Sequence, residues 1–442
     1  MAADAMKLLF GFEKGRHSVR DEIVGGITTF ITMAYILAVN PQIFSPLAEQ
    51  GMPTGAVFTA TALASIIGTL VMGFYAKKPF GLAPGMGLNA FFVYTVCLTM
   101  GYSWQFAITA ILIEGIIFIL LTLTKVREMI VNAIPVDMKK AISAGVGLFI
   151  AFIGLKNCNI VVDSPSTLIT LGDLSDKTAI LAIVTFVFTA LLMVLKVRGA
   201  LLIGIVVSTI IGIPMGLVSF ENFSFAVPSI KPIFCQFEWN QIFSWDMLIV
   251  VFTFLFIDMF DTIGTVVGVS MKAGMVDEEG HVDGVNRILM ADAVATTAGA
   301  CLGASTTSTY VESATGVSEG ARTGLAAIVI AACFALSLPL SSFFLAIPSA
   351  ATGAVLVLVG VMMANSIATI DFSRMEEAIP AFVTMLMMPF CYSISDGIMT
   401  GVIVYVVLHL LTFNREKIRM ISPTMAVLAV LFLAKYVIQS IS

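Results

Sequence analysis

The stretch GLAPGMGLNAFFVYTV, residues 81–96, is apolar enough for a membrane but is interrupted at its start. Pro84, Gly85 and Gly87 disfavour a helix there, and an uninterrupted apolar run begins near Asn89. A second stretch, GASTTSTYVESATGVSEG at 303–320, starts too polar and too β-branched for an ordinary lipid-facing helix. Unwound backbone is tolerated at membrane depth only where protein buries it or where it lines a cavity. The two stretches therefore predict a ligand site.

The composition is that of a membrane protein. Of the 442 residues, 59% are hydrophobic and 12% are charged, which is about half the charged share of a soluble domain. Runs long enough to cross a hydrocarbon layer of roughly 30 Å recur from Ile23 to Ile441. No soluble catalytic domain is left over, no constellation typical of an intramembrane enzyme is visible, and no basic tract suggests nucleic acid binding. We expect neither an enzyme nor a nucleic-acid partner.

The apolar runs predict an all-α polytopic membrane protein with fourteen transmembrane segments. Seven segments precede a polar stretch and seven follow it, at 24–45, 55–76, 84–100, 103–124, 138–156, 178–196 and 199–219, and at 246–269, 286–303, 305–319, 322–344, 348–365, 376–394 and 396–413. An odd number of segments in each half inverts the second half relative to the first. We therefore expect two inverted seven-segment repeats, with the third member of each (segments 3 and 10) discontinuous.

The distribution of positive charge predicts the orientation. Most Lys and Arg residues fall in loops on one side if the N-terminus, 1–22, is cytoplasmic. The N-terminus is therefore predicted to be inside, and we expect a multi-pass protein of the plasma (inner) membrane. The last apolar run, 423–441, is predicted to lie along the interface or periphery, with a further span left open.

Two aspartates lie in the apolar stretch FTFLFIDMFDTIGT, residues 252–265. On a helix Asp258, Asp261, Thr262 and Thr265 share one face. Each buried carboxylate costs roughly 2.5 to 3.5 kcal/mol near mid-membrane, so a functional role is favoured. The alternative is a buried polar network that fixes helix packing.

A third buried acid, Glu312, is expected where segment 10 turns helical. It is read either as an N-terminal capping carboxylate or as a residue that faces a ligand, and the two roles are compatible. The cysteines are scattered singly, without a CxxC pair or a His at ligand spacing, at Cys97, Cys158, Cys235, Cys301, Cys333 and Cys391. This pattern predicts buried small side chains rather than disulfides or a metal site.

Four motifs carry a resemblance to a known family. They are MAYILAVNPQIF (33–44), APGMGLNAFF (83–92), FIDMFDTIGT (256–265) and STTSTYVESATGVSEGARTGL (305–325). In this order, and over nearly the whole chain, they resemble the adenine/guanine/hypoxanthine permeases, the AzgA-like branch of the nucleobase/ascorbate transporter superfamily.

The resemblance implies a domain organisation. Segments 1–4 and 8–11 would form a core domain (23–124 and 246–346), and segments 5–7 and 12–14 a gate domain (125–219 and 347–413). The remaining parts would be an extracellular loop at 220–245 and a C-terminal apolar segment at 414–442. Such relatives form homodimers in which the core moves as an elevator against the gate.

The resemblance also implies site residues. Tyr310, Val311 and Glu312 match the Tyr-Gly-Glu triplet of uracil-transporting relatives, with Val311 in place of glycine. An acid and a histidine of those relatives align with Asp258 and Asp261, so the proton relay differs here. The implied substrate-binding set is Tyr35, Gly87, Leu88, Asn89, Asp258, Asp261, Tyr310, Val311 and Glu312.

The implied function is proton-coupled import of purine nucleobases. Carboxylates accept hydrogen bonds from purine N–H groups and carry the proton, with Asp261 the first choice and Asp258 and Glu312 the others. No cofactor is expected besides the proton, and the partners are the purine, membrane lipid and a second copy of the chain. An anion carrier or a uracil/xanthine carrier of the same fold is the alternative. The choice between adenine and guanine/hypoxanthine stays open.

Overall fold

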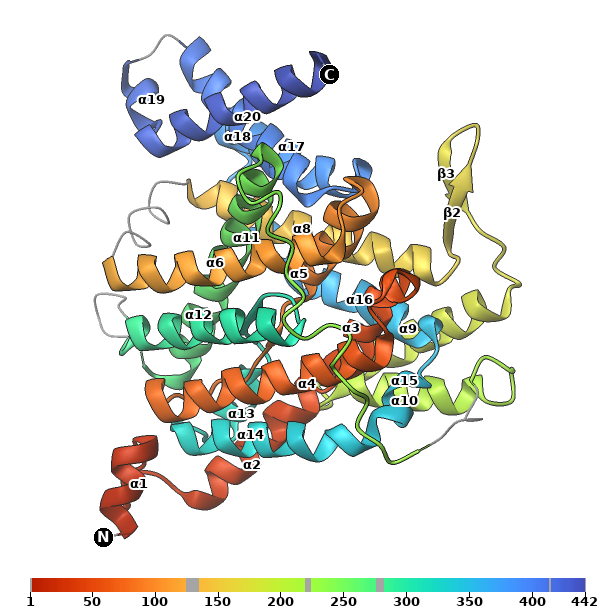
Figure 1. Cartoon of the computed structure of the whole chain (residues 1–442), viewed down its shortest axis with the longest axis vertical. Coiled ribbons are helices and arrows are strands. Elements are labelled where there is room, and N and C mark those ends of the chain that lie inside the picture. Colours follow the sequence, from red (N-terminus) through yellow and green to blue (C-terminus); the bar gives the residue numbers. More distant parts are fainter. Residues whose placement is uncertain (1, 125–134, 219–223, 276–281, 413–414, 442) are drawn as a thin grey trace.

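The computed structural model of the chain describes residues 2–124, 135–218, 224–275, 282–412 and 415–441 (Figure 1). In the first half the elements are α1 (Ala2–Phe10), α2 (Val19–Met33), α3 (Ile36–Phe44), η1 (Ser45–Gln50), α4 (Thr54–Val71), η2 (Met72–Ala76), β1 (Leu82–Pro84), α5 (Met86–Ala90), η3 (Phe91–Thr99), α6 (Trp104–Thr124), α8 (Val136–Asn157), β2 (Val161–Ser164), β3 (Leu168–Leu171), α9 (Lys177–Val194) and α10 (Ala200–Gly212). In the second half they are α11 (Trp245–Ala273), α12 (Val285–Leu302), β4 (Thr307–Thr309), α13 (Ser313–Ser318), α14 (Gly324–Ser337), η4 (Leu338–Leu340), α15 (Ser341–Leu345), α16 (Ser349–Ala364), η5 (Asn365–Thr369), α17 (Met375–Phe390), α18 (Ile394–Leu411), α19 (Arg415–Met420) and α20 (Pro423–Ile441). Residues 125–134 of the predicted gate domain and 220–223 of the predicted extracellular loop lie outside the described residues.

The protein is a mostly α-helical multi-pass membrane protein, with four short strands in two antiparallel pairs among the described residues. Seven helical stretches of the described residues are long and apolar enough to cross a membrane, at Val19–Gln50, Thr54–Ala76, Trp104–Thr124, Val136–Asn157, Lys177–Val194, Gly324–Leu345 and Ser349–Thr369. Shorter apolar helices accompany them at Met86–Thr99, Ala200–Gly212, Asp396–Leu411 and Met425–Ala434. The count of fourteen segments stays a prediction.

The helices pack into two groups. In the first group α4 packs on α12 and α14, α6 on α11 and α12, and α2 on α14. In the second group α8 packs on α16 and α17, α16 on α9 and α10, and α18 on α17. Figure 1 shows α4, α12 and α14 of the first group stacked nearly parallel. The α6–α12 contact corresponds to the α14–α4 contact. α4 and α6 are the second and fourth predicted segments of the first half, and α12 and α14 are the second and fourth of the second half. Inverted repeats require such matched contacts.

Glycines permit the closest helix contacts. A Cβ atom on Gly324 of α14 would overlap the backbone of Gly73 in η2, and one on Gly154 of α8 would overlap the carbonyl of Gly353 in α16. Small residues at such contacts are typical of membrane bundles, because van der Waals packing rather than the hydrophobic effect holds the helices together.

The C-terminal helix α20 packs along one face only. Met425, Leu428 and Phe432 are buried, and the Phe432 ring lies 5.8 Å from that of Phe252 in α11. Val427 and Val430 on the opposite face are 59% and 66% exposed. The helix therefore lies on the periphery of the bundle, beside α18.

We expect Gly324→Ala to destabilise the protein, because the added methyl group meets backbone that cannot rotate away. Overpacking of this kind costs about 1–3 kcal/mol, so the Tm of the purified protein should fall. Leu336→Ala on the same helix, where the side chain is 73% exposed, is the control and should leave Tm nearly unchanged. An unchanged Tm for Gly324→Ala would contradict the close contact.

Candidate functional site

Two short strands cross at the centre of the first helix group. β1 and β4 pair antiparallel, with Leu82 opposite Thr309, Ala83 opposite Ser308 and Pro84 opposite Thr307. All six residues are buried. Each strand thus satisfies backbone groups of the other, which unwound chain at membrane depth requires.

Further bonds extend the strand pair at both ends. The Gly85 amide donates to the Thr306 carbonyl at 3.0 Å, and the Tyr310 amide donates to the Gly81 carbonyl at 2.9 Å. The Tyr310 hydroxyl donates to the Pro84 carbonyl at 2.7 Å. Tyr310 therefore holds the two broken segments together as well as facing the cavity described below.

Helices begin directly after each strand. α5 starts at Met86, earlier than the start near Asn89 that the sequence indicated, and the Asn89 amide closes its first turn on the Gly85 carbonyl at 2.9 Å. This turn needs a residue without a side chain at position 87, because Val146 of α8 packs where a Cβ atom would lie. α13 follows β4, with Glu312 at its N-cap position. Both predicted discontinuous segments are therefore strand-then-helix elements.

A cavity of about 680 Å³ opens beside the crossing and is lined by both helix groups. Its wall consists of Tyr35, Gly85, Met86, Gly87, Ser143, Asp261, Thr265, Thr309, Tyr310, Val311, Glu312, Val359, Met362, Met363, Asn365, Ser366 and Thr369. This volume is within the range of roughly 300–1,000 Å³ that small-molecule sites occupy.

Two carboxyl groups face this cavity. Glu312 accepts a hydrogen bond from the Tyr35 hydroxyl at 2.8 Å. Asp261 lies near Gly85, where a Cβ atom would be 3.2 Å from Ser308 Oγ and 3.9 Å from Asp261 Oδ2. Glycine at position 85 thus keeps the space between the strand pair and the carboxylate open.

Asp258 does not line the cavity. It is fully buried and contacts the Thr262 hydroxyl at 3.2 Å. The same hydroxyl lies 2.9 Å from Asp292 of α12, and Asp292 in turn accepts from the Thr309 amide at 3.0 Å. The polar face predicted on this helix therefore divides, with Asp258 and Thr262 turned towards α12 and Asp261 and Thr265 towards the cavity.

Two supporting acids were missed by the sequence reasoning. Asp292 holds β4, and Glu114 of α6 accepts from the Thr306 hydroxyl at 2.7 Å. Both are fully buried. Each is the sole acid in its predicted segment (286–303 and 103–124), and this signal could have identified both.

The structure brings most of the predicted site residues together. Those that line the cavity are Tyr35, Gly87, Asp261, Tyr310, Val311 and Glu312. Leu88 lines a small adjoining recess. Asn89 is buried behind the wall, where its Oδ1 contacts Ser305. Among the described residues no group of three or more His, Cys, Asp or Glu could hold a metal ion.

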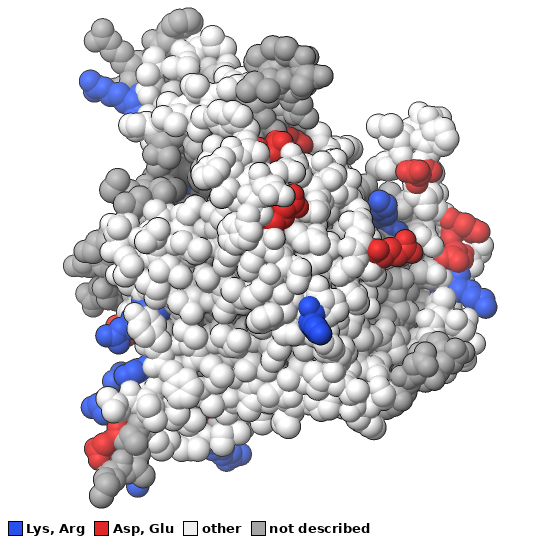
Figure 2. All heavy atoms as spheres, in the orientation of Figure 1, with Lys and Arg blue, Asp and Glu red and all other residues white. Residues whose placement is uncertain are grey.

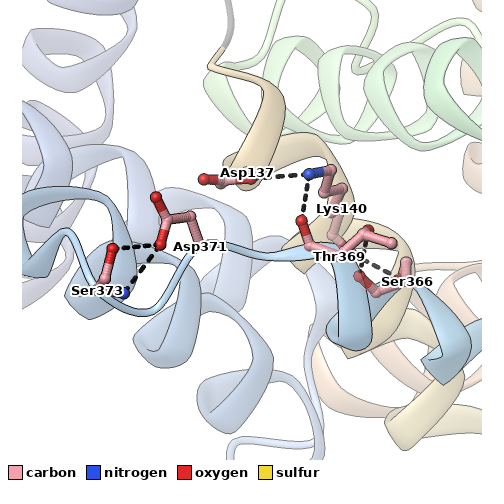
Figure 3. Close-up of polar contacts among 6 residues, drawn as sticks. All are labelled: Asp137, Lys140, Ser366, Thr369, Asp371 and Ser373. Atoms are coloured by element: carbon pink, nitrogen blue, oxygen red, sulfur yellow. Dashed lines mark hydrogen bonds and ion pairs between the residues drawn. The ribbon is translucent and has the colours of Figure 1, made fainter.

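The short helix η5 lines part of the cavity wall, and hydrogen bonds hold it against α8 (Figure 3). Lys140 of α8 pairs with Asp137 at 3.0 Å and donates to the Thr369 carbonyl, while the Ser366 hydroxyl donates to the Lys140 carbonyl at 3.1 Å. In the loop that follows, the Ser373 hydroxyl and amide donate to Asp371 and hold the pKa of that carboxyl below its ordinary value. These contacts join η5 to the second helix group.

Two unwound segments paired beside a cavity, within a bundle of membrane-spanning helices, are typical of a multi-pass membrane transport protein. Residues 20–400 match the sequence model of the Permease family (Xan_ur_permease). The chain belongs to this family and is a permease rather than an enzyme.

Relatives match over nearly their whole length. The putative permease MJ0326 of Methanocaldococcus jannaschii is 46% identical over 97% of both chains. The guanine/hypoxanthine permease PbuG of Bacillus subtilis is 43% identical over 98% of this chain and 99% of its own. The adenine permease AdeP of Escherichia coli is 38% identical over 98% and 96%. The resemblance inferred from the four motifs is confirmed.

Solved structures share the fold at low sequence identity. The transmembrane domain of the cyanobacterial bicarbonate transporter BicA gives a TM-score of 0.64 at 13% identity, covering 86% of this chain and 97% of that one. Murine Slc26a9, an anion transporter in the inward-facing state, gives 0.65 at 14% identity, covering 91% and 70%. These likenesses concern the fold alone.

We expect Asp292→Ala to weaken substrate binding although Asp292 lies outside the cavity wall. Its loss leaves the buried Thr309 amide without its acceptor, which costs roughly 1–3 kcal/mol and loosens β4. The KM for uptake should rise about tenfold or more, and Asp292→Asn, whose amide oxygen can still accept, should recover part of the loss. Equal KM values for Asp292→Ala and the parent would contradict this role.

Proposed function

We propose that the chain is a proton-coupled secondary active transporter that imports purine nucleobases across the plasma membrane. The observation that carries the proposal is the cavity in which Asp261 and Glu312 face the strand crossing. Full-length similarity to guanine/hypoxanthine and adenine permeases supports the choice of substrate class.

The cavity wall suits a planar base with N–H groups. Asp261 and Glu312 supply acceptors for purine N–H donors, and Tyr35 fixes Glu312 in place. Val311 is 49% exposed and projects into the cavity, where it narrows the space beside Glu312. Ser143 adds a hydroxyl group that can donate or accept, and the Thr309 hydroxyl, which donates to Asp292 at 3.3 Å, can accept.

The charge of the wall favours a purine over an anion. The residues that line the cavity in the described part of the chain include two acids and neither Lys nor Arg. A carrier for an anion such as bicarbonate would gain from a positive group at this place, and a carboxylate repels its substrate. The charge of the wall therefore disfavours the anion alternative. It does not distinguish a purine from uracil or xanthine, because these substrates differ from one another in the size of the base and in the groups along its edge.

The proton is assigned to Asp261 in this proposal. Its carboxyl faces the cavity, so it can exchange a proton with water in the cavity and also contact the substrate. Asp258 is linked through Thr262 to Asp292, which gives a buried set of acids behind the carrier group. Glu312, bonded to Tyr35, serves mainly to hold the base.

Alternating access is proposed to follow an elevator movement of the first helix group (core, 23–124 and 246–346) against the second (gate, 125–219 and 347–413). The cavity lies between the two groups and reaches η5 at one end. Outside the cavity wall the two groups also meet where the Tyr94 ring of η3 contacts the Tyr392 ring beyond α17, with centroids 5.5 Å apart. The gate would carry the contact between two copies in a homodimer.

The orientation rests on charge. Figure 2 shows Lys and Arg side chains gathered along the edge that carries the N-terminus and α1 in Figure 1. Positive residues concentrate on the cytoplasmic side of membrane proteins, so we place the N-terminus in the cytoplasm. The end of the cavity at η5 then faces inward and the Tyr94–Tyr392 contact faces outward.

Cells that lack their own purine permeases and express this chain should take up labelled hypoxanthine in a saturable manner. Unlabelled guanine or adenine should compete, whereas sulfate should not. Competition by guanine alone would show that the protein prefers purines with an oxygen at position six. Competition by adenine would show that the pocket accepts an amino group at that position. If neither labelled hypoxanthine nor labelled adenine enters the cells above background, the proposed function is wrong.

In Asp261→Asn we expect proton-driven accumulation of the purine to be lost. Uptake by the parent should fall as the external pH is raised, because fewer protons enter with the substrate; uptake by the variant should stay low and independent of pH. Asp246→Asn is the matched control, because Asp246 lies on the same helix and bonds to Tyr102 away from the cavity. Accumulation that survives in Asp261→Asn would sink the assignment of the proton.

A further inference from the structure

A segment without regular structure covers one end of the first helix group. In this strap, residues 228–238, the Pro228 carbonyl accepts from the Thr59 hydroxyl of α4 at 2.8 Å. At its other end the Glu238 amide donates to the Thr109 hydroxyl of α6 at 2.8 Å. The strap is therefore anchored to two helices of the same group. In the proposed orientation it lies on the outer side.

The middle of the strap is fitted closely to the end of α12. Ile233 is fully buried, and a Cβ atom on Gly303, the residue after α12, would lie 2.8 Å from the Ile233 carbonyl. Gly303 also has a φ of 82°, which favours glycine. The strap and the end of α12 thus hold a fixed mutual position.

Two cysteines meet at this contact. The Cys235 amide donates to the Cys301 carbonyl at 2.8 Å, and both cysteines are free thiols whose side chains lie close enough to interact. Cys235 is exposed and Cys301 is half-buried. The expectation that the cysteines are buried is therefore wrong for Cys235 and Cys391, which are exposed, and Cys301 is only half-buried. Their separation in the sequence did not indicate that Cys235 and Cys301 meet, because the packing of the strap brings them together.

The geometry points to a disulfide between Cys235 and Cys301 that forms on the outer face of the protein. A direct backbone bond between two residues is compatible with the Cα separation of roughly 4.4–6.8 Å that disulfides span. The exposed Cys235 can react with an incoming disulfide, protein-bound or of low molecular weight. This first exchange forms a mixed disulfide on Cys235 and releases one thiol. Cys301 then attacks the Cys235 sulfur and releases the second thiol, so the S–S bond of the oxidant is broken, one S–S bond forms in the protein, and the two cysteine protons leave on the two thiols.

The proposed disulfide would link the strap to the end of α12, and it would not cross the interface between the two helix groups that is proposed to move. Both cysteines belong to the first helix group and its covering strap, and neither lines the cavity. Formation of the bond should therefore stabilise the folded state, chiefly by restricting the unfolded chain, and should leave transport unchanged. The inference uses the orientation in the proposed function but not its substrate.

The test uses a variant that keeps Cys235, Cys301 and Cys391 and has alanine at the other three cysteines. Intact cells are treated with a membrane-impermeant maleimide that adds a mass tag, before and after reduction with TCEP. Cys391 is exposed beside Tyr392 and serves as the internal control for access from outside. We expect one tag, on Cys391, before reduction and additional tagging of Cys235 after it.

Two matched variants separate the outcomes. In Cys301→Ser on the same background Cys235 has no partner and should be tagged without reduction. Tagging of Cys235 before reduction in the parent variant would overturn the disulfide. Tagging of Cys391 together with silence of Cys235 even after TCEP would do the same, and silence of both until the cells are permeabilised would overturn the orientation as well as the disulfide.

A second measurement uses the natural sequence. A digest of the purified protein, alkylated without reduction, should contain a cross-linked pair of peptides that carry Cys235 and Cys301. The same sample should show a lower Tm after reduction, with an unchanged rate of purine uptake in reconstituted vesicles. Free alkylated peptides for both cysteines would contradict the proposal, whatever the result of the transport assay.

Discussion

The antiparallel pairing of β1 with β4 is the contact on which the rest of the structure depends. Two segments can be unwound in the middle of a membrane protein only if their amide and carbonyl groups find partners, and here each segment supplies them for the other. The buried acids around the pair extend this support. Asp292 accepts from β4, and Glu114 accepts from the residue just before it. The site and the fold are therefore stabilised by the same hydrogen bonds.

Much of the architecture could be predicted from the sequence because each transmembrane run carries its own signal. The breaks at Pro84 and in the polar stretch at 303–320 indicated where helices would be interrupted. That the two breaks pair with each other as strands was not predicted, since they lie in opposite halves of the chain and only three residues of each take part. Short strands of this kind have no periodicity that a sequence pattern can show.

The candidate site shows the same division. A helix places Asp258 and Asp261 on broadly one face, and this much followed from their spacing. Which of them meets a ligand depends on the rotation of α11 against α12, and that is fixed by packing. The Thr262 hydroxyl, between Asp258 and Asp292, turns the first carboxyl into the protein and leaves Asp261 at the cavity. The spacing alone cannot distinguish these two positions.

The surroundings of a carboxyl also explain why Asp292 and Asp261 can have different tasks. A carboxyl surrounded by fixed donors, as Asp292 is by the Thr309 amide and the Thr262 hydroxyl, stabilises one conformation. A carboxyl at the wall of a cavity exchanges its partners when water, a proton or a base arrives. A transporter needs both, because an unwound site that moved with every proton would not keep its shape, and a site with every carboxyl fully bonded would have no group left to bind the substrate. In the proposed function, this division lets Asp292 hold the strand pair while Asp261, at the cavity wall, exchanges its partners with the proton and the substrate.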